Sequence, residues 1–464
     1  MSKKLEIWGV NDPNISAQLA LAIKLDLFAK EAGLDVVCRF AESGTTMPQD
    51  VLHAEQKPFA FTQTPITSIL LHDKGVSTKI LAPLADIAGT QQVVIHRASG
   101  IHTPQDLEGK RIGIAKGAAV FIALTNMAKD CHVDLDQVYF INLLPSDQLA
   151  AFREKKLDAI ACWEPWTTEA QHYGGEFFFS GTRSEIPHIE GNVNWLINQS
   201  CLIAPDETID REPEKLIMIL KVLQKATLML ELYFEEAAAL LSEFFQRSPE
   251  DMQSIMRKNT YSMIMDSLFR IGVLSFRDFL YENGRVALKF SENQLYRTDL
   301  LREVDPALVL LEKGTKKDVG FFEKEGIYYK DNVSFEGDLS RLRFLMADDS
   351  VVVRNFLNRT LEILQAESLG EATTGQEAID MFARLRPNFM TMDLSMPGLS
   401  GVDAIQQIRQ MDPHVNIIVI SGIDVQEVRE EVFKLGVKIF IKKPFVPEKA
   451  ASVIRNILEK SITN

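Results

Sequence analysis

The stretch Thr391-Met392-Asp393-Leu394-Ser395-Met396-Pro397-Gly398 decides the fold of the C-terminal part of the chain. A mostly apolar run from Phe389 to Met392 predicts a buried strand, which ends at the carboxylate of Asp393 and is followed by a Met-Pro-Gly turn. Open parallel sheets place their functional groups in the loops that follow the carboxyl ends of such strands. The stretch therefore predicts a functional site at Asp393.

Three other apolar runs end in polar side chains that complement Asp393. They are residues 342–347 before Asp348-Asp349, residues 417–420 before Ser421, and residues 437–441 before Lys443-Pro444. Three carboxylates at one sheet edge repel one another unless a hard cation lies among them, and Mg²⁺ prefers such oxygen ligands. A phosphoryl group on Asp393 would also need a hydroxyl and a positive charge, which Ser421 and Lys443 supply. Taken alone, Asp348-Asp349-Ser350 could simply cap a helix; the ordered set favours a phosphorylation site.

Residues 341–464 resemble the CheY-like receiver domain of response regulators, a doubly wound flavodoxin-like (βα)5 fold. The resemblance implies that Asp393 is the phosphoacceptor and that Asp348, Asp349, Asp393 and the carbonyl of Ser395 bind Mg²⁺. It also implies that Ser421 and Lys443 hold the phosphoryl oxygens, that the Lys443-Pro444 bond is cis, and that Phe440 is the switch aromatic. The implied partner is a histidine kinase or phosphotransfer protein, and a homodimer through the receiver is a further possibility.

The length, net charge and cysteine content of the chain indicate its broad class of protein. The chain has 464 residues, a net charge of −14 and four scattered cysteines, which favours a soluble multidomain protein of a reducing compartment. The acidic charge disfavours nucleic-acid binding, because a phosphate backbone needs a cationic surface. We find no secretory signal and no apolar run long enough to cross a bilayer, and therefore expect a cytoplasmic protein.

The first two-thirds of the chain alternates predicted strands and helices, which indicates an α/β fold. We predict a two-lobed domain over residues 1–312, with lobe crossings near residues 92–96 and 194–204, and a charged linker over residues 313–340. A single amphipathic helix is expected over residues 14–31, and long helices replace the strands from about residue 213. Two lobes enclose a cleft, the usual place of a ligand site.

Several predicted loops and strand ends supply polar or aromatic side chains to that cleft, and Lys116-Gly117 precedes a helix whose start is suited to an anion. Trp163 is either a packing residue or a ligand-stacking one, and Lys116 either a solvated lysine or a ligand contact. The candidate ligand-binding residues are Asn11, Asn14, Ser43, Thr45, Gln63, Thr64, Lys116, Gly117, Trp163 and Glu164.

This region resembles type II periplasmic-binding-protein-like domains of the nitrate, sulfonate, taurine and thiamine-pyrimidine group. The similarity rests on residues 106–113, Lys116-Gly117, residues 142–147, and 157–159 with Trp163-Glu164-Pro165. It implies a small organic ligand in the cleft. Ala118 and Ala119 stand where relatives often offer a hydroxyl to an anion, and the cysteine-rich run of the eukaryotic pyrimidine synthases is missing.

Three functions follow from these features. The leading hypothesis is a cytoplasmic two-component signalling protein, not an enzyme, in which phosphorylation of Asp393 is coupled to ligand binding in the N-terminal domain. One alternative is an enzyme that acts on a pyrimidine-like or aromatic substrate. The other is an ABC-type solute-binding protein.

Overall fold

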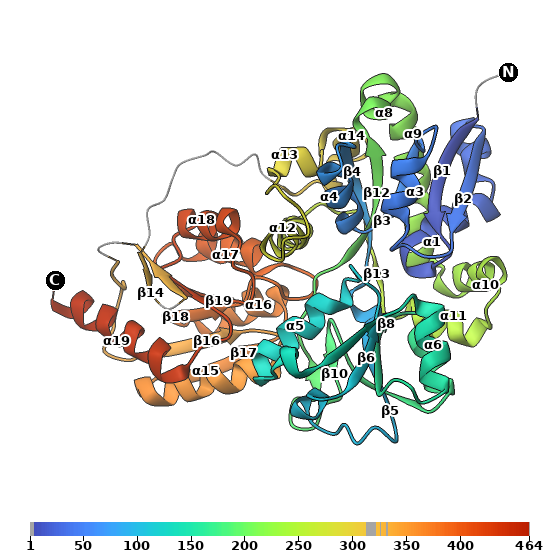
Figure 1. The fold of residues 1–464 in the computed structure, drawn as a ribbon. Helices are drawn as coiled ribbons and strands as arrows, with labels where there is room; N and C mark the ends of the chain where they lie inside the picture. The colour runs from blue at the N-terminus through green and yellow to red at the C-terminus, as the bar shows by residue number, and fades with distance from the viewer. Residues whose placement is uncertain (1–3, 312–321, 325, 331–332, 464) are drawn as a thin grey trace. The chain divides into compact units, whose positions relative to one another are not determined.

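The computed structural model describes residues 4–311, 322–324, 326–330 and 333–463 (Figure 1). The chain divides into two compact units. The first comprises residues 1–125, 133–182 and 195–311, and the second comprises residues 312–464 together with the segments 126–132 and 183–194. Residues 313–321, 325 and 331–332 of the predicted linker lie outside the described residues.

The first sheet of the N-terminal region has the strand order β13-β4-β12-β3-β1-β2. Strand β1 pairs in parallel with β2 and β3, whereas β12 runs antiparallel to β3 and β4. The strands are β1 (Leu5–Val10), β2 (Val36–Ala41), β3 (Ala60–Gln63), β4 (Thr78–Asp86), β12 (Gln199–Pro205) and β13 (Thr260–Tyr261).

The second sheet has the order β11-β10-β9-β5-β8-β6-β7. Its strands are β5 (Gln91–His96), β6 (Arg111–Ile114), β7 (Tyr139–Asn142), β8 (Ala159–Trp163), β9 (Gly175–Ser180), β10 (Arg183–Ser184) and β11 (Gly191–Asn192). The chain passes from the first sheet to the second through the short helix η1 (Ala88–Thr90). The first lobe crossing was expected near residues 92–96, but these residues belong to β5 and the crossing lies just before them. It returns through residues 193–198; most of the expected 194–204 belongs to β12.

The predicted helix over residues 14–31 is two helices, α1 (Pro13–Lys24) and α2 (Leu27–Ala32). Asp26 adopts a left-handed backbone with φ of 56° between them, a conformation that ends a right-handed helix. The remaining helices of this region are α3 (Met47–His53), α4 (Pro65–Asp73), α5 (Val120–Cys131), α6 (Pro145–Arg153), α7 (Trp166–His172), α8 (Asp206–Arg211), α9 (Pro213–Leu232), α10 (Phe234–Phe245), α11 (Pro249–Met256), α12 (Ser267–Glu282), α13 (Glu292–Leu295) and α14 (Asp299–Val304).

The C-terminal domain contains a parallel sheet in the order β17-β16-β18-β19-β20, the flavodoxin-like order 2-1-3-4-5 that the sequence predicts. The strands are β16 (Arg343–Ala347), β17 (Glu367–Ala372), β18 (Phe389–Met392), β19 (Asn416–Ser421) and β20 (Ile439–Lys442), and the helices are α15 (Val351–Leu364), α16 (Gly375–Leu385), α17 (Gly401–Met411), α18 (Gln426–Lys434) and α19 (Pro447–Thr463).

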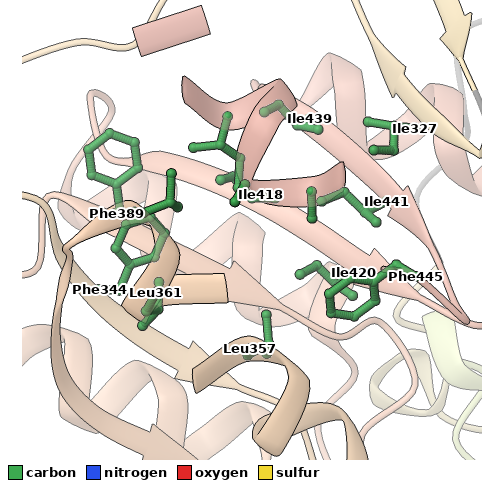
Figure 2. Close-up of a cluster of buried hydrophobic side chains, with 14 of the residues drawn as sticks. Ile327, Phe344, Leu357, Leu361, Phe389, Ile418, Ile420, Ile439, Ile441 and Phe445 are labelled. Carbon is green, nitrogen blue, oxygen red and sulfur yellow. The ribbon is translucent and has the colours of Figure 1, made fainter. Parts of the chain in front are cut away.

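Apolar side chains from the central strands form the core on one face of this sheet (Figure 2). The rings of Phe344 and Phe389 stack with centroids 4.9 Å apart, and Ile418 and Ile441 continue the buried layer toward the far edge. Leu357 of α15 packs into the same cluster. These contacts hold four strands in register, so that their carboxyl ends meet along one edge.

Part of the predicted linker belongs to this sheet. Strands β14 (Phe322–Lys324) and β15 (Ile327–Tyr329) form an antiparallel hairpin, and β15 pairs with β20. Ile327 is 5% exposed and lies in the core cluster (Figure 2). Residues 322–329 therefore do not serve as a free linker, because the hairpin covers the edge that β20 would otherwise expose.

We predict that Gly401→Ala destabilises the C-terminal domain by about 3 kcal/mol. A methyl group at this first residue of α17 would collide with the backbone carbonyl of Asp393. Calorimetric unfolding of the full chain measures the loss, and Gly422→Ala, where a methyl group would meet nothing within 4 Å, is the matched control. Equal unfolding temperatures for the two variants would contradict the prediction.

Candidate functional site

Three carboxylates converge at the carboxyl end of the receiver sheet. Asp348 and Asp349 follow β16, and Asp393 follows β18, which is the neighbour of β16. All three are at most 5% exposed, and one carboxylate oxygen from each lies within 4.8 Å of the others. The parallel pairing of the two strands thus places the acidic groups where the sequence predicts them.

Lys443 supplies the nearby positive charge. Its Nζ lies 2.8 Å from Asp348 Oδ2 and 3.0 Å from Asp393 Oδ2. Burial alone would lower the pKa of Lys443, but Asp348 and Asp393 outweigh burial and raise it. Burial also raises the pKa of Asp348 to about 7 and holds that of Asp349 well above its usual range. One lysine therefore leaves the acidic cluster short of positive charge.

The acidic cluster fits a divalent cation. Asp349 Oδ1 is buried and accepts no hydrogen bond from any residue that the structure describes. Such an orphaned oxygen is costly in a protein interior unless a cation or water satisfies it. Oxygen ligands of this number and charge suit Mg²⁺.

The remaining predicted receiver residues surround the same strand ends. Ser421 ends β19, is fully buried, and its Oγ accepts a hydrogen bond of 3.1 Å from the amide of Ile423. The Lys443-Pro444 peptide bond is cis. Phe440 is fully buried in β20, and Ser395 lies in the loop after Asp393. The structure thus gathers the receiver residues in one region of the domain.

A separate cavity of about 460 Å³ lies in the first unit. Six predicted ligand residues line it, namely Thr45, Gln63, Thr64, Lys116, Gly117 and Trp163. Gly117 has φ of 89°, a conformation that disfavours side chains, and this turn leads to α5. Two exposed cations, Lys116 and Arg285, also line the cavity.

Four predicted ligand residues do not line this cavity: Asn11, Asn14, Ser43 and Glu164. Glu164 is fully buried, pairs with Lys258 and accepts a 3.0 Å hydrogen bond from the amide of Thr168. Asn14 donates to the Glu164 carbonyl at 2.9 Å, and Ser43 bonds to Thr45 at 2.9 Å. The exposed Asn11 donates its amide to the carbonyl of Ala41. These residues hold the structure around the cavity.

The structure adds lining residues that the sequence analysis missed, among them Asp12, Gln91, Asn198 and Arg285. Asp12 Oδ1 accepts hydrogen bonds from the backbone and side chain of Asn14, and burial raises the pKa of Asp12 to about 7. Asn198 is fully buried, and neither side-chain polar atom has a partner among the described residues. Asp12 lies between the predicted ligand residues Asn11 and Asn14; the other three come from distant segments without a local motif.

Comparisons with known proteins agree with the C-terminal geometry. The family model described as response regulator receiver domain matches residues 344–455. Chemotaxis protein CheY of Thermotoga maritima is 37% identical over 115 residues, which are 25% of this chain and 96% of that protein. Protein CcdB of Bacillus subtilis is 33% identical over 116 residues, 25% of this chain and 97% of that protein. The chain belongs to the response regulator receiver family through its C-terminal domain.

The N-terminal region matches the family model described as NMT1/THI5 like over residues 14–231. The periplasmic aliphatic sulphonate binding protein SsuA from Escherichia coli superposes with a TM-score of 0.53 at 17% identity, covering 70% of this chain and 99% of that one. The periplasmic nitrate-binding protein NrtA from Synechocystis PCC 6803 gives 0.52 at 14% identity, covering 66% and 89%. These similarities confirm the predicted binding-protein fold.

Because Glu164 is buried against Lys258, removing this cation should destabilise the folded domain. Lys258→Met leaves a fully buried carboxylate unpaired, and we expect a loss of about 3 kcal/mol in the free energy of unfolding. Lys156→Met breaks an exposed pair with Glu154 and should change stability by less than about 0.5 kcal/mol. Calorimetry of both full-length variants makes the comparison; an unchanged Lys258→Met unfolding temperature would contradict the assignment.

Proposed function

We propose that this chain is a two-component signalling protein that is phosphorylated on Asp393 by a histidine kinase or phosphotransfer protein. The convergence of Asp348, Asp349, Asp393 and Lys443 at one sheet edge is the observation that carries the proposal. A carboxylate oxygen of Asp393 would attack the phosphorus of a phosphohistidine. The new P–O bond forms as the P–N bond breaks, and the imidazole leaves with the electron pair.

The surrounding residues would position and neutralise the transferred group. Asp348, Asp349, Asp393 and the carbonyl of Ser395 would hold Mg²⁺, which offsets charge on the phosphoryl oxygens. Lys443 already contacts Asp393 and would contribute a charge-assisted hydrogen bond to one of those oxygens. Ser421 would turn its hydroxyl toward another, and the buried Phe440 would repack in response.

Asp393→Asn should abolish phosphorylation, because an amide nitrogen is too poor a nucleophile to replace the carboxylate. The full chain is incubated with acetyl phosphate and Mg²⁺, and the attached phosphoryl group is followed by intact mass. Asp380→Asn changes an exposed carboxylate of α16 and should be phosphorylated like the unchanged protein. Chelation of Mg²⁺ should stop the reaction in every variant. Phosphorylation of Asp393→Asn at the normal rate would refute the site.

For the N-terminal domain we propose binding of a small organic molecule with a carboxamide or amidine group. The amide of Asn198, which has no partner among the described residues, offers a donor and an acceptor side by side, which matches a carboxamide that presents the complementary pair. A protonated amidine has N–H donors only and would use the Asn198 oxygen together with Asp12. Only Oδ1 of Asp12 accepts the hydrogen bonds from Asn14, so Oδ2 can accept an N–H from the ligand. Trp163 supplies an aromatic wall.

An oxyanion fits this cavity less well. Asp12 is 5% exposed, and in its ionised form its carboxylate would repel a sulfonate or nitrate placed beside it. Ala118 and Ala119 line the start of α5 without a hydroxyl. Lys116 and Arg285 are exposed, and the surrounding water and salt weaken their attraction for an anion.

We propose further that binding in the cavity and phosphorylation of Asp393 influence one another in the cytoplasm, where kinases obtain ATP. The support is the presence of both domains in one chain. Among the described residues, no helix is long and apolar enough to cross a membrane. Association of two copies through the receiver remains a proposal that sedimentation of the phosphorylated protein would test.

Nicotinamide and benzamidine should raise the unfolding temperature of the N-terminal domain by about 3 °C at saturating concentration, because binding to the folded state alone stabilises it. Ethanesulfonate and nitrate should not. Asn198→Leu should remove the stabilisation, whereas Asn293→Leu, an exposed change on α13, should retain it. Stabilisation by ethanesulfonate but by neither nitrogen compound would contradict the proposed ligand class.

A further inference from the structure

The edge of the receiver sheet is covered by a segment of the chain itself. In the five-strand order of the receiver, β20 would be an edge strand, but β15 pairs with it so that Tyr328 lies opposite Phe440. The amide of Lys442 donates to the carbonyl of Gly326 at 2.9 Å. The hairpin therefore completes the hydrogen bonding of the strand that carries Phe440 and leads directly into Lys443.

Tyr328 connects this hairpin to the loop that follows Ser421. Its ring meets that of Phe440 edge-on, with centroids 5.9 Å apart. Its hydroxyl donates to Asp424 Oδ2 at 3.0 Å, and the Arg429 guanidinium lies 4.1 Å from the ring centroid. Asp424 also contacts Lys442 at 2.9 Å and pairs with Arg429. Tyr328 is thus held by the side chains of the β19–α18 loop and of α18.

Asp424 lies in the loop that begins after Ser421. Only two residues separate them, and Ser421 Oγ accepts the amide hydrogen bond of Ile423 between them. The bond to Ile423 is lost only if Oγ itself moves, as when the Ser421 side chain rotates about χ1 to bring its hydroxyl to a phosphoryl group on Asp393, since a hydroxyl that merely turns its hydrogen can donate and accept at once. Such a rotation would allow the loop to shift and Asp424 to withdraw from the hydroxyl of Tyr328.

We propose that the β14–β15 hairpin is a phosphorylation-controlled latch, held on β20 by the Tyr328–Asp424 contact and released when Asp393 is phosphorylated. The release step rests on the proposed phosphorylation, whereas the holding contact does not. Release uncovers the hydrogen-bonding edge of β20 and frees Phe440 to repack. Because the hairpin lies before β16 in the chain, its release also lengthens the connection to the N-terminal domain.

Residue-level hydrogen exchange of the full chain tests the holding contact without a phosphodonor. Tyr328→Phe keeps the ring but loses the hydroxyl, and we expect the Lys442 amide to exchange about tenfold faster, because a hydrogen bond to a charged group is lost. Tyr139→Phe removes an exposed hydroxyl from β7 and should leave exchange unchanged. Equal Lys442 exchange in the two variants would overturn the latch.

The same measurement after treatment with acetyl phosphate and Mg²⁺ tests release. Intact mass first establishes whether a phosphoryl group is attached. Faster exchange of the Lys442 amide in the phosphorylated protein, by about tenfold, supports the latch; unchanged exchange in that protein overturns it. Failure of phosphorylation refutes the proposed function instead, and the Tyr328→Phe comparison still decides whether the contact holds the hairpin.

Discussion

The receiver domain depends on the electrostatic constraint that three buried carboxylates share a single lysine. Asp348, Asp349 and Asp393 are brought together by the parallel pairing of β16 and β18, and Lys443 bridges two of them. Like charges this close and this deeply buried are unfavourable unless further positive charge arrives. A bound cation would therefore stabilise this cluster of carboxylates. It would do so at the point where a phosphoryl group would add still more negative charge.

The cavity of the N-terminal domain is lined by polar atoms whose hydrogen bonds are not all satisfied. Asn198 is buried and has no side-chain partner in the part of the chain that the structure describes, and only Oδ1 of Asp12 accepts the hydrogen bonds from Asn14. Unsatisfied groups of this kind cost free energy in the absence of a ligand, and a complementary ligand recovers it on binding. In both domains the groups that the protein leaves unpaired are therefore the best indication of what it binds. The hairpin at β20 differs, since there the chain satisfies its own strand edge.

Much of the fold and of the receiver site could be predicted because the information is local. Each apolar strand is adjacent in the sequence to the polar residue that follows it, so both can be recognised without knowing their neighbours in the fold. This holds for the strands that lead to Asp349, Asp393, Ser421 and Lys443. Strand β17 belongs to the predicted (βα)5 fold but cannot be located from its own residues, since it is a polar edge strand with little burial. The β14–β15 hairpin lies in a charged segment that indicates a linker. Asn198 and Arg285 could not be assigned to the cavity, because long-range packing alone brings them there. Glu164 was selected as a ligand residue because its partner, Lys258, lies 94 positions away.

The central claim is that the two domains communicate, and the most direct test is a pair of calorimetric titrations. The carboxamide or amidine compound that stabilises the N-terminal domain most is titrated into the full chain before and after phosphorylation with acetyl phosphate and Mg²⁺. Communication requires a coupling free energy between the sites, and we predict dissociation constants that differ by at least about fivefold. Equal constants, with phosphorylation verified by mass, would show that the domains bind and react independently and would contradict the account.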